Sequence, residues 1–208
     1  NKLWKLMIDL NMKKKELNNL IGHFQYCFNQ ECSKIYTTDN DDELKVDFLL
    51  FEPNEDFPFY KVVSAGASDY QMPQSNGLLP NRNEYIIFLS KDFNIQSDEF
   101  NWYLNLINYV ATYAYYEKAS ITYSHAIDIK QLNNEKFPAV FINFPEIYND
   151  SYILICKLSM FKTCACLQLM PMTNQELDEL TQYGVAKILD TYYPKEGKPI
   201  FLADRKGE

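Results

Sequence analysis

Glycine is scarce in this sequence, and the glycines present follow no phosphate-binding pattern. Only six occur, and none forms the G-x-G-x-x-G or G-x-x-x-x-G-K-[ST] arrangement that cradles nucleotide phosphates. Uninterrupted apolar stretches of the roughly eighteen residues that span a bilayer are also lacking. We therefore expect no nucleotide enzyme of the familiar kinds, no cofactor, no small-molecule substrate and no membrane partner.

Positive charge is in deficit. The chain has 20 Lys and Arg against 28 Asp and Glu, which gives a formal net charge of -8 at pH 7. Such a surface repels phosphate backbones, so we expect no nucleic-acid partner, and it attracts basic proteins. The same charge also serves solubility alone, an alternative that the sequence leaves open.

Cysteine is too sparse for a disulfide scaffold. The five cysteines are an odd number without a dense spacing framework, which favours reduced thiols in the cytoplasm. The first residues show neither an initiator methionine nor a secretory hydrophobic region, so we expect residue 1 to be a cloning or processing boundary and expect no targeting signal. A cytoplasmic location follows as the expectation.

Hydrophobic and aromatic residues, in contrast, are plentiful. They make up 47% and 15% of the 208 residues, which excludes a disordered chain and suits one sizeable core. We expect a single α/β domain over residues 1–208.

The clearest local pattern lies between Thr163 and Tyr193. Cys164–Met170 is almost continuously apolar, which predicts a central strand covered on both faces, and Pro171 is expected to end it. Thr173 with Glu176 three residues later forms a capping box, which predicts that one helix follows through Gly184.

Periodicity predicts the other elements. Apolar residues at helical spacing indicate helices over residues 3–28 and, with Ser97 as N-cap, over Ser97–Tyr116. Strands are predicted at Lys45–Pro53, Phe59–Ala65, Glu84–Ser90, Ile121–Ile129, Phe137–Phe144 and Tyr152–Leu158. Alternation along Ile121–Ile129 places His125 among aliphatic side chains, so we expect a hydrogen-bonded core histidine.

Two loops are candidates for contact with a partner. Thr37–Glu43 is acidic and lacks the glycine and distal glutamate of a calcium-binding EF-hand loop. Gly66–Pro80 is long and irregular, and loops of this length in compact domains are functional more often than average.

Catalytic and metal-binding residue sets are incomplete. Ser68, Asp69 and His125 suggest a hydrolase, but a long loop follows the serine where a nucleophile elbow needs a helix. A metal half-site at His23, Cys27 and Cys32 matches no strong zinc spacing. The thiols of Cys164 and Cys166 point to one face of a strand with no third ligand in evidence. We expect neither enzymatic activity nor a bound metal.

Five stretches follow one another along most of the chain in a distinctive order. They are V-V-S-A-G-A-S-D-Y-Q-M-P at Val62–Pro73, N-E-Y-I-I-F-L at Asn83–Leu89, N-W-Y-L-N-L-I at Asn101–Ile107, the strand through His125, and L-Q-L-M-P-M-T-N-Q-E-L at Leu167–Leu177. In order and spacing they resemble the suppressor of fused family. Ala67, Gln71 and Ser90 differ from the residues common in that family. These differences bear on the geometry of the loops more than on membership.

The resemblance implies an α/β fold with a mixed, largely antiparallel sheet flanked by helices. It places the core at about residues 46–192, with an N-terminal helix at about 3–28 and a C-terminal tail at 194–208. It also implies a non-enzymatic, protein-binding role. Animal members restrain a transcription factor with the help of a second domain, whereas short members resemble bacterial proteins, several of them predicted immunity proteins that neutralise a toxin encoded beside them.

These implications lead to one hypothesis and one alternative from a different class. The hypothesis is an immunity protein or antitoxin that masks a cognate, basic, nuclease-like toxin stoichiometrically. Its expected contact residues are Asp39, Asp41, Asp42 and Glu43 in the acidic loop and Ser68, Asp69, Tyr70 and Met72 in the second loop. The alternative is a regulatory scaffold that adds a peptide to a sheet edge.

Overall fold

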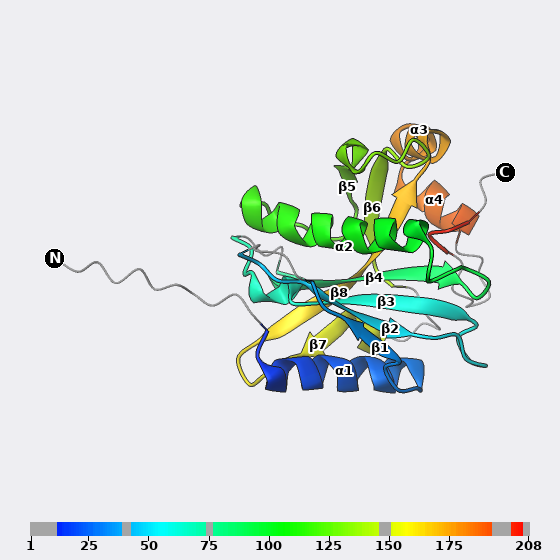
Figure 1. The fold of residues 1–208 in the computed structure, drawn as a ribbon. Helices are drawn as coiled ribbons and strands as arrows, with labels where there is room; N and C mark the ends of the chain where they lie inside the picture. The colour runs from blue at the N-terminus through cyan, green and yellow to red at the C-terminus, as the bar shows by residue number, and fades with distance from the viewer. Residues whose placement is uncertain (1–11, 39–42, 74–76, 146–150, 193–200, 206–208) are drawn as a thin grey trace.

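The computed structural model describes residues 12–38, 43–73, 77–145, 151–192 and 201–205. Eight strands form one mixed sheet in the order β1-β2-β3-β4-β8-β6-β5, and β7 pairs with β8 beside that path. Helix α1 covers one face of the sheet and helix α2 the other (Figure 1). The predicted mixed, largely antiparallel sheet flanked by helices is confirmed.

The elements have the following bounds. The helices are α1 (Lys14–Phe28), α2 (Asp98–Tyr116), α3 (Asn174–Tyr183) and α4 (Val185–Tyr192). The strands are β1 (Lys34–Tyr36), β2 (Asp47–Phe51), β3 (Phe59–Ala65), β4 (Asn83–Ser90), β5 (His125–Asp128), β6 (Ala139–Asn143), β7 (Ile155–Lys157) and β8 (Thr163–Met172). Short 3₁₀ turns lie at η1 (Ala67–Asp69), η2 (Lys130–Leu132) and η3 (Ser151–Leu154).

Strand β8 is the centre of the sheet. It pairs in parallel with β4, whereas every other strand pair among the described residues is antiparallel. On its other side β8 pairs first with β7 and then with β6, because Ala165 faces Ile155 and Gln168 faces Asn143. Nine of its ten residues are buried, as its almost continuous apolar run predicts.

Alternation along the strands produces two cores, one on each face. Tyr85, Ile87 and Leu89 of β4 point into the core that α2 closes, whereas Ile86 and Phe88 point into the core that α1 closes. Helix α1 contributes three buried apolar residues one turn apart, Leu20, Phe24 and Phe28, and His23 is buried beside them. The helical spacing read from the sequence therefore matches the buried face.

Two predictions about the end of β8 need correction. Pro171 does not end the strand, which continues to Met172 with Pro171 paired opposite Val140. The single helix predicted after Thr173 is two helices, because Gly184 between them has a positive φ of 79° that an α-helix cannot contain. The capping box itself is confirmed, since the Thr173 side chain accepts from the Glu176 N–H and the Glu176 carboxylate accepts from the Thr173 N–H.

The prediction of a long strand with a core histidine at Ile121–Ile129 is wrong. Ser124 adopts a positive φ of 64°, so the chain turns there and β5 begins only at His125. Strand β5 is the last in the sheet order, and of its four residues Ile127 alone is buried, so His125 is exposed. The predicted strand Tyr152–Leu158 is likewise a 3₁₀ turn followed by the three residues of β7.

The N-terminal and C-terminal expectations are partly outside the described residues. The predicted helix over residues 3–28 starts at Lys14 within them, and residues 1–11 are not described. The predicted tail packs into the fold where it is described. Ala203 donates its N–H to the Phe88 carbonyl over 2.8 Å and accepts from the Tyr103 hydroxyl, and Phe201 is buried.

Candidate partner-binding surface

The loop that follows β3 is shaped by a close backbone crossing at Gly66. Its φ of 128° lies in a region that side chains rarely adopt, and a Cβ atom placed there would lie 2.2 Å from the Lys45 carbonyl oxygen. Only glycine allows the chain to pass here and enter the 3₁₀ turn η1. The signature stretch Val62–Pro73 therefore contains a residue that its backbone path requires.

Glu84 holds this loop from beneath. Its fully buried carboxylate accepts hydrogen bonds from the Ser64 hydroxyl and from the backbone N–H groups of Gly66 and Ser68, the latter two at 3.0 and 3.1 Å. Burial raises the pKa of Glu84 to about 7, and the hydrogen bonds act in the opposite direction. A buried carboxylate satisfied by three donors fixes the start of the loop in one conformation.

Arg82 holds the loop from its carbonyl side. The guanidinium donates to the carbonyl oxygens of Ser68 and Asp69 over 2.8 and 2.9 Å and to the Gln71 side chain over 3.1 Å. A planar guanidinium with five N–H donors suits such convergent oxygen atoms. Residues 68–71 are thereby fixed relative to the start of β4.

Lys162 ties the same loop to the turn between β7 and β8. Its ammonium pairs with the carboxylates of Asp69 and Glu16, the latter at 3.0 Å, and all three side chains are largely buried. Burial raises the pKa of Asp69, and the hydrogen bond from Lys162 opposes that rise. The loop is therefore connected to helix α1 as well as to the sheet.

The exposed part of this assembly is a small aromatic surface. The ring of Tyr70 lies edge-on against Tyr115 of α2, at 5.4 Å between centroids, and Tyr115 contacts Tyr116 at 5.2 Å. The Tyr115 hydroxyl donates to the Glu43 carboxylate, and the Lys118 ammonium lies 4.1 Å from the Tyr115 ring centroid. We call these five residues the tyrosine cluster: Glu43, Tyr70, Tyr115, Tyr116 and Lys118.

The tyrosine cluster joins the two loops that the sequence indicated as candidates for partner contact. Glu43 is the last residue of the acidic loop and Tyr70 lies in the second loop, so Tyr115 connects them. Asp39, Asp41 and Asp42 lie outside the described residues. Of the remaining predicted contact residues, Glu43 is exposed and Tyr70 half-buried.

The other predicted contact residues have supporting positions. Ser68 is fully buried, and Met72 is 5% exposed, with its sulfur 3.2 Å from the Ile121 N–H. The Asp69 carboxylate is engaged by Lys162. In this conformation these side chains shape the loop, whereas Tyr70 and its neighbours form its more exposed part.

Sequence reasoning missed the residues that hold the loop, Arg82, Glu84, Tyr115 and Lys162. One signal was present for Glu84, which is a lone carboxylate in an otherwise apolar strand segment. Its partner Gly66 lies 18 residues earlier in the chain, and periodicity carries no information about such a pairing.

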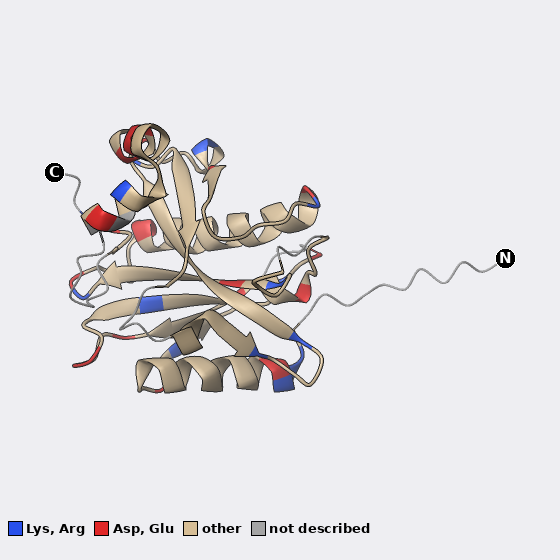
Figure 2. Cartoon of the chain, turned by 180° about the vertical axis from the view of Figure 1, so that it is seen from behind, with Lys and Arg blue, Asp and Glu red and all other residues tan. Residues whose placement is uncertain are grey.

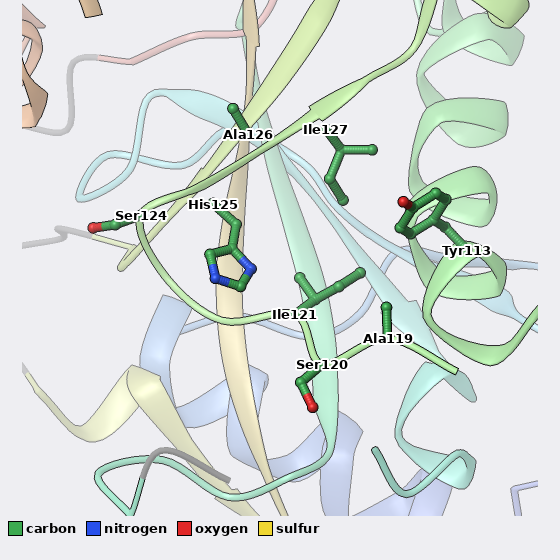
Figure 3. Close-up of a pocket in the computed structure, with 8 residues that line it drawn as sticks. All are labelled: Tyr113, Ala119, Ser120, Ile121, Ser124, His125, Ala126 and Ile127. Carbon is green, nitrogen blue, oxygen red and sulfur yellow. The ribbon is translucent and has the colours of Figure 1, made fainter. Parts of the chain in front are cut away.

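A shallow pocket of about 330 Å³ lies between the end of α2 and β5 (Figure 3). His125 and Tyr113 are its ionisable residues, and the His125 ring nitrogen accepts from the Thr122 N–H at 3.4 Å. Ser68 and Asp69 line no part of it. Across the described parts of the chain, no hydrogen bond links His125 to either residue, so the hydrolase alternative has no assembled catalytic set there.

Among the described residues, no three His, Cys, Asp or Glu side chains are placed to hold a metal ion. His23 instead has its Nε2 atom 3.4 Å from the Ile153 carbonyl oxygen and 3.8 Å from the Cys27 sulfur. Cys164 and Cys166 are free thiols buried in the core under α1. Within the same described ranges, no helix is long and apolar enough to cross a bilayer.

A family model described as suppressor of fused protein (SUFU) matches residues 42–206, which include the last two residues of the acidic loop, the whole second loop and the sheet from β2 onward. The chain belongs to the suppressor of fused family. The resemblance read from the sequence motifs is thereby confirmed. No curated protein sequence matches the chain.

Solved structures share this SUFU fold at low sequence identity. A putative SUFU homolog from Neisseria gonorrhoeae FA 1090 matches with a TM-score of 0.65 and 14% identity, over 94% of this chain and 97% of that one. The Sufu–Fu complex contains a match with a TM-score of 0.66 and 14% identity, over 93% and 91%. Drosophila Suppressor of Fused gives 0.65 and 14%, and there the chain covers 51% of the longer protein.

Proposed function

We propose that this SUFU domain is a non-enzymatic protein-binding module that serves as an immunity protein and masks a cognate toxin in the cytoplasm. Family membership supports a binding role, because a protein of this fold is known in a complex with Fu. The formal charge of -8 favours a basic partner by speeding association. The mechanism is occlusion of the toxin surface.

The observation that carries the proposal is the rigid support beneath the tyrosine cluster. Glu84 is fully buried, Lys162 is largely buried and Arg82 is partly buried, and all three bind the short loop from Gly66 to Gln71. Preorganising a loop in this way reduces the conformational entropy lost on binding. Tyrosine is enriched among the residues that contribute most binding energy at interfaces, and three tyrosines belong to this cluster.

Binding of the product of the neighbouring gene tests this assignment. We expect the two proteins to co-purify, and the double variant Tyr70→Ala, Tyr115→Ala to bind at least about tenfold more weakly. Tyr183→Ala is the matched control, since Tyr183 is 59% exposed on α3 and belongs to another surface. Equal losses in the test and control variants would assign the binding to some other region.

The acidic loop is tested separately by charge reversal. Replacing Asp39, Asp41, Asp42 and Glu43 with lysine should slow association and flatten its dependence on salt, because exposed charges steer a basic partner. If affinity and salt dependence both stayed unchanged, the acidic loop would have no part in binding.

A regulatory scaffold is the alternative, and one observation favours it. Within the described residues β5 pairs only with β6, so its outer backbone edge is open to an added strand. Such binding should be insensitive to salt and should survive unfolding or truncation of the partner. Masking of a toxin requires its folded surface, so an unfolded partner distinguishes the two functions.

A further inference from the structure

The turn between β7 and β8 exposes two large apolar side chains side by side. Phe161 is 95% exposed and Met160 is 79% exposed, the two highest values among the large hydrophobic residues of the described chain. Neither contributes to any of the three hydrophobic cores. Folding therefore does not account for an apolar pair at this position.

The turn is held firmly in place. Both Leu158 and Ser159 donate their N–H groups to the Lys162 carbonyl oxygen, at 2.9 and 3.0 Å, which closes the hairpin. The Lys162 ammonium pairs with Glu16 and Asp69, and the Asn19 side chain donates to the Leu158 carbonyl over 2.8 Å. The tip of the hairpin, Met160 and Phe161, thus projects from a base that is fastened to α1 and to the loop after β3.

Cations surround the hairpin although the whole chain is acidic. Lys13, Lys14 and Lys15 are exposed at the start of α1, immediately before Glu16, and Lys157 is exposed on β7. Figure 2 shows blue segments gathered at the start of α1 and on the hairpin beside it. Among the described residues, the carboxylates that pair with the hairpin are those of Glu16 and Asp69, and both bind Lys162. Exposed charges farther away than about 8 Å are largely screened at physiological salt, so the described charges nearest the hairpin carry a positive excess.

We propose that the β7–β8 hairpin is a membrane-surface contact, with Met160 and Phe161 entering the interface of an anionic bilayer while Lys13, Lys14, Lys15 and Lys157 bind lipid headgroups. Aromatic side chains favour the interfacial region, and lysines just outside it are attracted to acidic lipids. The chain would lie on the membrane without crossing it, as some proteins do through small apolar surfaces flanked by cations. This proposal departs from the sequence-based expectation of no membrane partner, which rested on the lack of a spanning segment.

A bilayer fits these features better than a protein partner does. A stable protein interface buries about 800 Å² on each side around a desolvated centre, whereas this apolar surface is a projecting pair with lysines on the neighbouring elements. A fluid interface accepts such a wedge without a matching cavity. The lysines also repel the basic toxin proposed above, so this contact is separate from the tyrosine cluster. It does not depend on the proposed function.

Co-sedimentation of the full chain with lipid vesicles tests the proposal. We expect binding to vesicles of phosphatidylcholine and phosphatidylglycerol in equal parts, and much weaker binding to pure phosphatidylcholine. Met160→Ser with Phe161→Ser should lower the affinity about tenfold. Lys13→Glu, Lys14→Glu and Lys15→Glu together should lower it about a hundredfold.

Matched controls separate the hairpin from general effects of charge and hydrophobicity. Lys91→Glu, Lys130→Glu and Lys187→Glu make the same charge change at exposed sites on other elements, and Leu78→Ser removes a 74% exposed apolar residue elsewhere. Both controls should bind as the wild type does. A Phe161→Trp variant should show a blue shift in fluorescence with the anionic vesicles as the indole leaves water.

Three outcomes would overturn the proposal. The first is no sedimentation with anionic vesicles. The second is equal loss in the hairpin and control variants. The third is loss of binding to a protein partner in the hairpin variants while vesicles remain unbound, which would identify Met160 and Phe161 as a protein contact.

Discussion

The N–H of Gly66 donates to the buried carboxylate of Glu84 over 3.0 Å, which joins the end of β3 to the neighbouring strand β4. This bond exists because Gly66 follows a backbone path closed to other residues, and because Glu84 is surrounded by donors where the strand pattern would place an apolar residue. The loop that presents Tyr70 depends on both residues.

Gly66→Ala should destabilise the protein by about 3 kcal/mol, because the new Cβ would lie 2.2 Å from the Lys45 carbonyl oxygen at a positive φ. Gly22→Ala is the matched control. No atom other than those of the adjacent helix backbone lies within 4 Å of its Cβ position, and alanine in a helix is favoured by about 1 kcal/mol, so this variant should be more stable. Urea unfolding measures both, and a neutral Gly66→Ala would contradict the crossing described here.

Glu84→Gln should remove one part of the pH dependence of stability. Burial raises the folded-state pKa of Glu84 to about 7 from an ordinary value of 4.5. Between these values the folded state keeps a proton that the unfolded chain releases, so this contribution is full below pH 4.5 and is lost as pH rises to 7, at up to about 1.4 kcal/mol per unit. Urea unfolding across this range should show a shallower decline for Glu84→Gln than for wild type.

The exposed Glu55 provides the control for that measurement. Glu55→Gln should follow the wild-type profile closely, because its carboxylate stays in solvent in both states. If Glu84→Gln and wild type had parallel profiles, Glu84 would not titrate differently in the folded protein.

Lys61 should make the stability of the protein rise with pH, opposite to the effect of Glu84, and at higher pH. Its side chain is fully buried, donates to the Glu52 carbonyl over 2.7 Å and lies 5.5–5.6 Å from the rings of Phe28, Phe57 and Phe59. Burial lowers its pKa to about 7 from 10.5. Between these values the unfolded chain holds a proton that the folded state lacks, so stability should rise with pH.

Lys61→Met should abolish this rise and increase stability near pH 7, where wild type carries the cost of a buried ammonium. Lys34→Met is the control, since the Lys34 side chain is exposed above Tyr36. Urea unfolding curves from pH 6 to 10 measure how the stability of wild type and both variants depends on pH. A wild-type rise that survived in Lys61→Met would assign it to other groups.

Arg82→Lys should loosen the loop beneath Tyr70 without unfolding the sheet. Lysine cannot reproduce the three convergent donations to Ser68, Asp69 and Gln71. Hydrogen exchange should become about tenfold faster in residues 67–72 and stay unchanged in β8. Arg205→Lys serves as the control, because Arg205 binds Glu176 and the Pro171 carbonyl, away from this loop. Unchanged exchange in residues 67–72 would show that the loop is held by other contacts.

Local patterns in the sequence were enough for most of the fold. The bounds of β3 and the Ser97 cap of α2 were predicted because apolar alternation and capping involve neighbouring residues. Strand β1 was missed, since its three residues become a strand only by pairing with β2, where Lys34 faces Leu50. The turn at Ser124 was missed because its positive φ leaves the apolar alternation of Ile121–Ile129 intact.

The candidate surface was only partly predictable for the same reason. The sequence identified the loop of Tyr70 by its length and composition, and the acidic loop of Glu43 by its charge. It could not show that Tyr115, in the last turn of α2, connects the two. Nor could it show that Ser68 and Met72 point inward, which depends on how the loop folds over Glu84.

Titration of the neighbouring gene's product is the measurement that tests the proposed immunity function most directly. The toxic activity of that product should fall linearly as this protein is added and should vanish at one equivalent, because masking is stoichiometric. The Tyr70→Ala, Tyr115→Ala variant should need a large excess for the same effect. Full activity of the neighbouring product in the presence of excess wild-type protein would contradict the proposal.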